Sequence, residues 1–395
     1  MNDRISSQNH PQFSCSQTHV IVSAAATTLK PYDFPTMNPT ELRKTLIEAI
    51  ENWEDHSFDE LARAIYAHQY THNSAYRTFC NNRGVLPDTL ESIDQIPAVP
   101  TDAFKLVDLF IDTDPTHTFL TSGTTTESRG AHHFFTLAAY RASLHPTFTH
   151  FCNPAEEPLR MLVLAPTFED LPESSLSFML SEVVERWGDD ESQFFVTVED
   201  GRWKVDFPAI RRALDQACHD QATTMVLGTA FAFAEFFDDL PDDTTWTLPP
   251  GSRLMETGGF KGRTKEISRD ELYAQFTKIL GLARASCIGE YSMTELSSQT
   301  YTKDDSFRFH APPWLKIQIV DPIKLTPHDR PGRVGLIRFV DLANIDSVMA
   351  VQTSDRGVLH DDGGLQLLGR APDSELRGCS LTIEEIVGAR TSPSA

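Results

Sequence analysis

The sequence predicts an α/β fold built mainly on parallel strands, and two patterns support this. Between residues 160 and 290, short apolar runs alternate with helix-like stretches, which is typical of strand–helix–strand units. After about residue 312 the helical periodicity fades. Val334–Asp341 and Leu365–Leu368 then have the length and the flanking Gly and Asp residues of short antiparallel strands. We therefore expect sheet-and-helix layers followed by a small antiparallel β region.

The N-terminal part is predicted to be helical after a polar leader. Residues 1–36 are rich in Ser, Thr, Gln and Asn without periodicity, so we expect them to be disordered. The sequence leaves open whether translation starts at Met1 or at Met37. Apolar residues recur at helical spacing directly after Met37, and a second helix is predicted over Asp59–Phe79.

The central part supplies the expected parallel strands and their helices. The expected strands are 161–165, 194–198, 225–227 and 285–288, and the expected helices are 175–187, 208–219, 229–237 and 268–281. Open α/β sheets bind ligands at the carboxyl ends of their strands. Pro166-Thr167, Gly228-Thr229 and Glu290-Tyr291 follow three of these strands, so we expect them at a ligand-binding edge.

Composition and charge exclude several classes of function. The chain carries 56 acidic and 34 basic residues, a net charge of −22, which opposes non-specific binding to nucleic acid or to an anionic membrane. Its six cysteines are scattered without a CxxC pair, which argues against a zinc site, a redox motif or a disulfide framework. No apolar run is long enough to span a membrane and no signal peptide is evident, so we expect a cytoplasmic enzyme with a small-molecule substrate.

The segment Phe119–Arg129 is the most informative for chemistry. It reads Phe-Leu-Thr-Ser-Gly-Thr-Thr-Thr-Glu-Ser-Arg, so hydroxyl groups surround one glycine and a base follows. Such a loop presents hydroxyls and main-chain N–H groups to a polyphosphate, although the Gly-Lys-Ser/Thr ending of a Walker loop is absent. By itself, the segment is more typical of a solvated Ser/Thr loop.

Four further motifs follow this hydroxyl loop along the chain. They are Gly-Gly-Phe-Lys at 258–261, Tyr-Ser-Met-Thr-Glu at 291–295, Thr-Ser-Asp-Arg-Gly at 353–357 and Gly-Arg at 369–370. Their order and spacing resemble the nucleotide-site motifs of adenylate-forming enzymes. Within that superfamily, Ile96–Lys105, Gly-Gly-Phe-Lys and Arg-Gly-Cys-Ser-Leu at 377–381 are similar to the acyl-protein synthetases that supply the fatty-acid reductase of bacterial luciferase. A phenazine-biosynthesis protein is also similar, and the resemblance spans roughly residues 90 to 385.

The resemblance implies a role for each motif in binding ATP and Mg²⁺. The implied phosphate-binding residues are Ser122, Gly123, Thr124, Thr125, Thr126 and, for the α-phosphate, Thr294. Gly258 and Gly259 are implied to lie against the adenine and Tyr291 to stack on it. Asp355 and Arg370 are implied to bind the ribose, and Glu295 to hold Mg²⁺.

The resemblance also implies the domain organisation. Residues 37–368 correspond to the large domain of adenylate-forming enzymes, with two packed sheet-and-helix subdomains, and 369–395 to a vestige of the C-terminal domain. Two departures from the motif pattern are Thr126 in place of a usual Gly and Arg129 in place of a common Lys. The mobile C-terminal domain and its catalytic Lys have no counterpart, as is also true of the acyl-protein synthetases.

The expected reaction is activation of a carboxylic acid as an acyl-adenylate, followed by transfer to a cysteine, a protein or another thiol. Cys379 matches the acyl-accepting cysteine of the acyl-protein synthetases, and a thiolate beside Arg377 is suited to attack an acyl-adenylate. Its alternative role is that of a packed linker residue. A reductase or carrier protein is the expected partner. Two other functions stay open: an aryl- or acyl-CoA ligase of the phenylacetate-ligase type, and a non-catalytic binder of nucleotide or acyl-adenylate.

Several histidines and phenylalanines are better explained by structural roles than by functional ones. His132 and His133 follow the hydroxyl loop, but adjacent histidines are more often surface or capping residues. His68 and His72 have the i, i+4 spacing of a metal pair without an evident third ligand, which favours a solvated helix face. The phenylalanines around residues 231–237 recur at helical spacing, so most are expected in the core.

Overall fold

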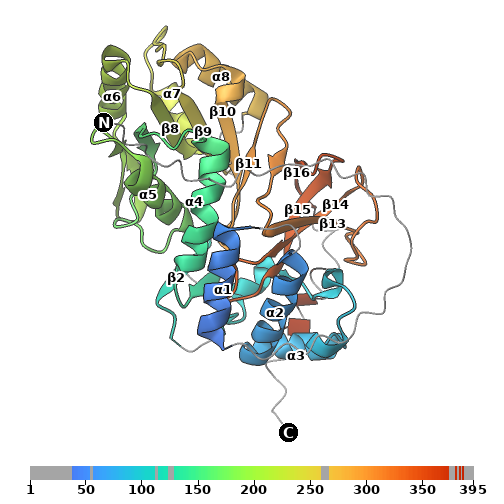
Figure 1. The fold of residues 1–395 in the computed structure, drawn as a ribbon. Helices are drawn as coiled ribbons and strands as arrows, with labels where there is room; N and C mark the ends of the chain where they lie inside the picture. Colours follow the sequence, from blue (N-terminus) through green and yellow to red (C-terminus); the bar gives the residue numbers. More distant parts are fainter. Residues whose placement is uncertain are drawn as a thin grey trace, which may run out of the picture.

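The computed structural model confirms the α/β class. It describes residues 38–53, 57–111, 114–122, 129–258 and 267–372, together with Cys379, Thr382, Ile383, Glu385 and Ile386. Among these residues one mixed sheet runs through the molecule in the order β13-β14-β15-β16-β12-β11-β10-β9-β8-β4-β5. The two expected sheet-and-helix parts are therefore joined into one continuous sheet, with a parallel part and an antiparallel part (Figure 1).

The parallel part contains five strands with helices on both faces. The strands are β4 (Arg160–Leu164), β5 (Gln193–Phe194), β8 (Thr224–Thr229), β9 (Arg253–Thr257) and β10 (Cys287–Tyr291). Helices α4 (Ala138–Cys152) and α5 (Ser175–Trp187) bury their apolar side chains on one face. Helices α6 (Phe207–Asp220), α7 (Ala230–Asp238) and α8 (Arg269–Leu280) cover the other. Since both faces are covered, the strands are apolar runs rather than alternating ones.

The antiparallel part forms the C-terminal half of the sheet. Its strands are β11 (Thr300–Thr302), β12 (Phe309–His310), β13 (Leu315–Val320), β14 (Val334–Asp341), β15 (Ala350–Leu359) and β16 (Leu365–Arg370), and the short β1 (Val99–Pro100) pairs parallel with β15. Antiparallel pairing of β10 with β11 joins the two parts. The end of β10 therefore lies next to the antiparallel strands, although it belongs to the parallel sheet.

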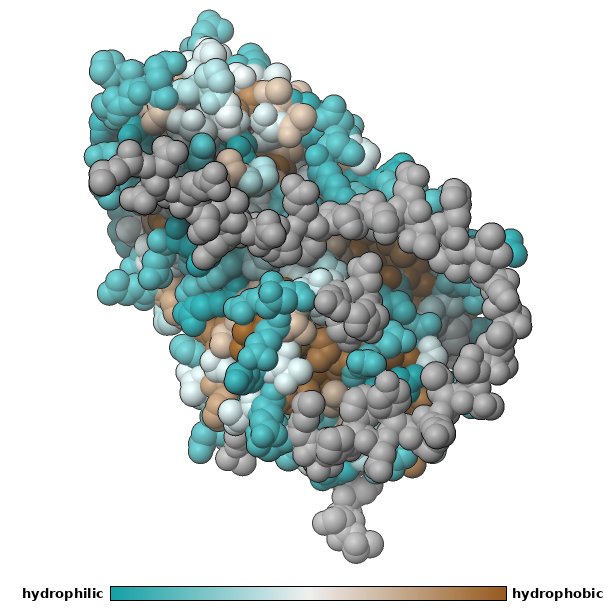
Figure 2. Space-filling model, in the orientation of Figure 1, coloured by the Kyte–Doolittle hydropathy of each residue, from teal (hydrophilic) through white to brown (hydrophobic). Residues whose placement is uncertain are grey.

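Three N-terminal helices pack on the antiparallel part: α1 (Pro39–Glu51), α2 (Ser57–His72) and α3 (Ser74–Asn82). The prediction of a single helix over Asp59–Phe79 is wrong, because the helix is interrupted at Asn73. The Asn73 side chain accepts the main-chain N–H of Tyr76 at 3.0 Å and so begins a new helix. Figure 2 shows apolar residues on this side of the molecule, in the area where Figure 1 places α1 and α2.

The boundaries of several other elements differ from the predicted ones. The strand expected over 194–198 is split into β5 and β6 (Val196–Glu199), and β6 forms a hairpin with β7 (Arg202–Val205). The strand expected over 285–288 begins later, at Cys287, after a 3-10 turn. The 3-10 turns are η1 (Pro87–Thr89), η2 (Ile93–Gln95), η3 (Thr101–Lys105) and η4 (Arg284–Ser286).

A second hairpin, β2 (His117–Leu120) with β3 (Ala131–Phe134), flanks the hydroxyl loop. The loop residues Gly123, Thr124, Thr125 and Thr126 lie outside the described residues, as do the predicted leader and Gly259. None of the helices in the described ranges is both long and apolar enough to cross a membrane.

Candidate functional site

Three of the predicted motifs meet at one edge of the sheet. The Tyr291 hydroxyl, at the end of β10, donates to Asp355 Oδ2 at 2.8 Å. Asp355 on β15 is paired in register with Arg370 on β16, and Arg370 Nε lies 3.6 Å from Asp355 Oδ1. Residues separated by up to about 80 positions in sequence therefore form one row of a phenol, a carboxylate and a guanidinium.

The Tyr291 ring is fixed by aromatic neighbours. Its centroid lies 5.7 Å from that of Phe309 and 6.0 Å from that of Phe339. Burial, reinforced by the charge of Asp355, holds the pKa of Tyr291 well above its usual range. The hydroxyl therefore stays protonated and acts as a donor to Asp355.

The segment after Tyr291 is held by hydrogen bonds to its main chain. Asn344 Nδ2 donates to the main-chain oxygen of Glu295 at 2.7 Å. Asp341 Oδ2 accepts the main-chain N–H groups of Ser297 and Ser298, both at 2.9 Å. These contacts fix the backbone at Thr294 and Glu295, and the Glu295 side chain is itself buried. The carboxylate of Glu295 is close enough to Tyr291 to contribute to the raised pKa of the phenol.

His132 connects the hydroxyl-loop hairpin to this same segment. Its Nδ1 lies 2.8 Å from the main-chain oxygen of Thr294, which can only accept, so the ring proton is on Nδ1. Burial lowers the pKa of His132 to about 4, and the ring is neutral. Its Nε2 is buried without a hydrogen-bond partner among the described residues. Sequence reasoning gave His132 a low weight, because no sequence spacing connects it with a residue 162 positions away.

Arg129, at the end of the hydroxyl-loop segment, binds protein groups near the start of that segment. Its guanidinium donates to the main-chain oxygens of Thr121 at 2.8 Å and Leu120 at 3.2 Å and pairs with Glu173 at 3.3 Å. Of the predicted phosphate-loop residues, Ser122 is described and is exposed. In this structure, the side chain noted as a replacement for Lys therefore binds protein groups at the start of the loop.

Gly258 leaves the main chain accessible at the carboxyl end of β9. It has a φ of +74°, a conformation that favours glycine, and no atom lies within 4 Å of where a Cβ would stand. The residue before it, Thr257, donates from Oγ1 to Glu290 Oε2 on β10. The edge thus combines an exposed glycine with a buried carboxyl group.

Glu290 is a polar residue at the carboxyl edge of the parallel strands. The sequence predicted this position but indicated no role for the side chain. It is 3% exposed, and its Oε1 has no hydrogen-bond partner among the described residues. Its cross-strand neighbour Tyr301 also has a buried hydroxyl without a partner in that set. Burial raises the pKa of Glu290 to about 7. The only sequence signal was a glutamate inside an apolar strand.

Cys379 lies on the other side of the antiparallel strands. It is 5% exposed and packs with Val320, Leu336 and Ala371. Leu336 and Phe339 are three positions apart on β14, so their side chains point to opposite faces, and Phe339 is the one that contacts Tyr291. Cys379 and the Tyr291 row are therefore on opposite faces of β14.

The expected thiolate at Cys379 is not present in this arrangement. Burial raises the pKa of the Cys379 thiol to about 11, and the nearby Arg338 only partly offsets the effect. Arg377, the cation expected beside the thiol, lies outside the described residues. The thiol is protonated while it stays packed, since a buried anion without strong pairing is costly.

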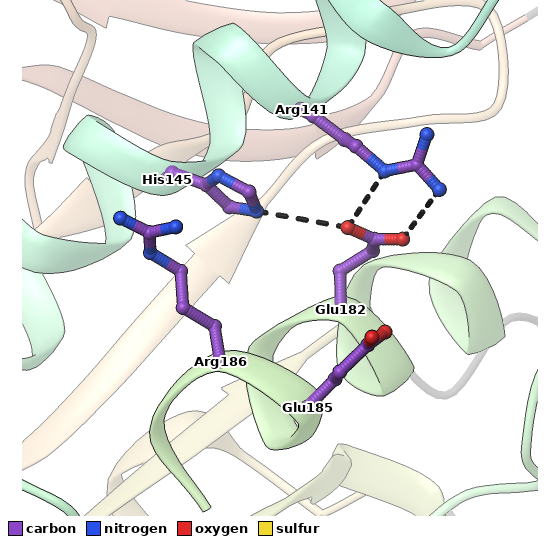
Figure 3. Close-up of a pocket in the computed structure, with 5 residues that line it drawn as sticks. All are labelled: Arg141, His145, Glu182, Glu185 and Arg186. Atoms are coloured by element: carbon purple, nitrogen blue, oxygen red, sulfur yellow. Dashed lines mark hydrogen bonds and ion pairs between the residues drawn. The ribbon is translucent and has the colours of Figure 1, made fainter.

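A charged groove between α4 and α5 is separate from these motifs. It encloses about 400 Å³ and is lined by Arg141, His145, Glu182, Glu185 and Arg186 (Figure 3). Arg141 donates to both oxygens of Glu182 at 2.8 and 2.7 Å. The charges of Arg141 and Glu182 are thus already paired, and none of the predicted nucleotide residues lines the groove.

The histidine pair on α2 is not on a fully solvated face as expected. His68 is 6% exposed, whereas His72 is exposed, and no cluster of three potential metal-ligating His, Cys, Asp or Glu residues occurs in the described ranges. The phenylalanines of α7 meet expectation, with Phe233, Phe236 and Phe237 in the core.

Comparisons with known proteins identify a family and a relative. The family model for acyl-protein synthetase (LuxE) matches residues 47–387. A long-chain-fatty-acid–luciferin-component ligase from Aliivibrio fischeri is 22% identical over 344 residues, covering 83% of this chain and 88% of the relative.

A solved ligase structure shares the fold. A 2-hydroxyisobutyryl-CoA ligase in complex with 2-HIB-AMP and CoA superposes with a TM-score of 0.57 at 15% identity, covering 80% of this chain and 70% of that chain. ATP-bound MatB from Rhodopseudomonas palustris gives a TM-score of 0.46 at 18% identity, over 65% of this chain and 48% of that chain. The chain thus spans about half the length of MatB.

Asp341→Asn is expected to destabilise the protein by about 2 kcal/mol, since one amide oxygen cannot replace two carboxylate oxygens that accept several N–H and O–H groups. Urea denaturation followed by circular dichroism measures the change. Asp321→Asn, in a solvent-accessible turn, is the matched control and should change stability much less. Equal effects of the two substitutions would contradict the bracing role of Asp341.

Glu290→Gln is expected to stabilise the protein more at pH 8 than at pH 5. The folded-state pKa of about 7 exceeds the unfolded value of about 4.3, so burial of Glu290 costs stability that grows as pH rises between these values. The gain in free energy of unfolding of the variant over wild type should increase by up to about 3 kcal/mol from pH 5 to pH 8. Thermal unfolding of both proteins at the two pH values measures this gain in stability. A gain that is the same at pH 5 and pH 8 would show that Glu290 is not neutral at low pH.

Proposed function

The chain belongs to the acyl-protein synthetase (LuxE) family of adenylate-forming ligases, and from this premise we propose how its own residues activate a carboxylic acid with ATP and transfer the acyl group to a thiol. The observation that carries the proposal is the row formed by Tyr291, Asp355 and Arg370. It brings three motifs of the resemblance to one edge of the sheet.

The row provides the groups that a nucleoside needs. Asp355 Oδ atoms accept the ribose hydroxyls, and Arg370, which is largely exposed, adds a donor beside them. The aromatic face of Tyr291 supports the adenine, while its hydroxyl keeps Asp355 oriented. The open main chain at Gly258, continued by Gly259, allows close approach of the base.

The phosphates are assigned to the adjoining segments. We assign the β- and γ-phosphates to the segment with Ser122, Gly123, Thr124, Thr125 and Thr126, which precedes Arg129 in the sequence and follows the main-chain oxygens that Arg129 binds. Thr294, which His132 holds to the same hairpin, binds the α-phosphate.

Glu295 is the residue that would hold Mg²⁺. Its side chain is a buried carboxylate on the braced segment, and Mg²⁺ is commonly held by one or two carboxylates together with substrate phosphates. A single carboxylate therefore fits the ion. When bound, Mg²⁺ neutralises phosphate charge.

The first half-reaction requires no protein nucleophile. The substrate carboxylate attacks the α-phosphorus, an oxygen–phosphorus bond forms, and the bond to pyrophosphate breaks. The chain's contribution is to hold the two reactants in line and to place N–H, O–H and guanidinium donors where negative charge accumulates. Since Glu295 is buried, contacts with its carboxylate are stronger than in water.

The second half-reaction is assigned to the Cys379 sulfur as the acyl acceptor. The thiolate attacks the carbonyl carbon of the acyl-adenylate and AMP leaves with the bonding electron pair. Because Cys379 is buried on the opposite face of β14, it must leave its packing with Leu336 and Ala371 and lose its proton before it reacts. A reductase or carrier protein would then take the acyl group. Direct transfer to such a protein or to CoA is the alternative.

Glu295→Gln and Asp355→Ala are each expected to slow carboxylate-dependent exchange of pyrophosphate into ATP by roughly ten- to a hundredfold, through lost metal and ribose contacts. Asp361→Ala, in the exposed turn after β15, is the control and should keep wild-type exchange. Circular dichroism verifies folding. Full exchange by either site variant removes that residue from the nucleotide site, and no exchange by wild type with any acid tested favours a non-catalytic binder.

Incubation with ATP, Mg²⁺ and a labelled acid is expected to leave a thioester on Cys379 that neutral hydroxylamine releases. Cys379→Ser should abolish this label and retain pyrophosphate exchange, because adenylation precedes the use of the thiol. Cys218→Ser, at a partly exposed cysteine of α6, is the control and should be labelled normally. Undiminished labelling of Cys379→Ser would mean that the acyl group leaves directly from the adenylate.

A further inference from the structure

A cleft outside the nucleotide motifs lies where the start of α1 meets the end of α2. It encloses about 650 Å³ and is lined by the first turn of α1, by Arg43, by His68 and His72, and by Ile111 and Phe135. None of the residues assigned above to ATP, Mg²⁺ or the acyl group lines it. Figure 1 shows α1 and α2 side by side on this face.

Arg43 is held rigidly with part of its guanidinium unpaired. Its Nε donates to Asp346 Oδ1 at 2.7 Å, and its Cζ lies 4.5 Å from the centroid of the Phe135 ring. Within the described part of the chain, neither of its terminal nitrogens has a hydrogen-bond partner. Since Arg43 is only 8% exposed, the protein has fixed a planar fork of donors in a sheltered position.

The two histidines add buried polar groups to the same cleft. His68 is 6% exposed, and its Nε2 is buried with no hydrogen-bond partner in the described ranges. Its ring centroid is 4.7 Å from that of the exposed His72. Burial, with smaller contributions from His72 and Arg43, lowers the pKa of His68 to about 4, so a neutral ring stands beside the guanidinium. An unpaired buried polar atom is costly unless a ligand or water satisfies it.

The remaining surroundings favour a negative ligand over a metal ion. The cleft lies at the positive end of α1, a helix of 13 residues, where Asn38 caps the main-chain N–H groups of Thr40 and Glu41. Among the described residues that line the cleft, Arg43 is the one with a permanently charged side chain, and its Nε is paired with Asp346. Two histidines without a third ligand in the described ranges do not make a metal centre, whereas a guanidinium fork matches the two oxygens of a carboxylate or phosphate.

We propose that this cleft is a second ligand site that binds an oxyanion, a phosphate or a carboxylate group, through the terminal nitrogens of Arg43 and the His68–His72 pair. The site is distinct from the nucleotide site, and its existence does not depend on the reaction proposed above. Asp346 provides a connection between them. Its Oδ2 accepts the main-chain N–H of Phe135 at 3.0 Å, and Asn344, two residues earlier, holds the main chain of Glu295.

Gln69, which follows His68, strengthens this connection. Its Nε2 donates to the main-chain oxygen of Asn344 at 2.7 Å, and its Oε1 accepts the main-chain N–H of Met349 at 3.0 Å. A ligand in the cleft would therefore contact Arg43, which is one hydrogen bond away from the segment 341–349, and His68, whose chain neighbour Gln69 is hydrogen-bonded to that segment.

Thermal unfolding of the full chain tests the proposal with inorganic phosphate and with acetate, each against sodium chloride of equal ionic strength. We expect phosphate, acetate or both to raise the Tm of wild type and of Asp355→Ala, since the latter alters only the nucleotide site. Comparison of the two anions separates a phosphate site from a carboxylate site. Isothermal titration calorimetry gives the dissociation constant, which should increase roughly tenfold in His72→Ala and in Arg43→Lys, which keeps the charge but loses the fork.

Lys44→Ala, an exposed neighbour of Arg43 on α1, is the matched control and should bind as wild type does. His72→Ala decides the outcome if Arg43→Lys does not fold, because His72 is exposed. Equal affinity of His72→Ala and Lys44→Ala overturns the proposal, as does the absence of any anion-specific rise in Tm.

Discussion

The buried carboxylate of Asp341 is the constraint on which the site depends. It accepts main-chain N–H groups from Ser297, Ser298 and Ala343, and so fixes two turns against each other at the end of β14. Asn344 in the same turn holds Glu295. Burial raises the pKa of Asp341 to about 6, which measures the cost of placing a charge there. Several hydrogen bonds to the charged form offset that cost, and the resulting segment is rigid.

A low-polarity environment surrounds the carboxyl edge of the parallel strands. Burial lowers the pKa of His132 and raises that of Tyr291, so both groups are neutral at pH 7, and it raises the pKa of Glu290 to about 7, so this carboxyl is partly protonated there. These largely neutral surroundings leave the motif residues Glu295 and Asp355 as the main negative groups near the row. In a ligase that neutralises phosphate charge, this makes each remaining donor more effective.

The sheet separates Tyr291 from Cys379 in space. One face of β14 contacts Tyr291 and the other packs Cys379, so the two steps of the proposed reaction would use opposite sides of the same strand. A thiol buried with a raised pKa is unreactive until it moves. If Cys379 is the proposed acyl acceptor, this packing protects its thiol before an acyl-adenylate is present. Arg43 in the cleft and Gln69 next to His68 are hydrogen-bonded to Asp346 and Asn344, so the proposed second ligand site adjoins the braced segment 341–349.

The sequence by itself determined the α/β class, the helix Ser175–Trp187, the strand Val334–Asp341 and the order of the nucleotide motifs, because periodicity and motif spacing are local properties of the chain. It did not determine the break at Asn73, the split of 194–198 or the burial of His68, since these depend on which neighbours cover each segment. Only the tertiary structure decided that His132 binds Thr294, that Glu290 is buried beside Tyr301 and that Cys379 lies across the sheet from Tyr291. Contacts between residues far apart in sequence follow from strand pairing and register, and a single residue's type carries no information about either.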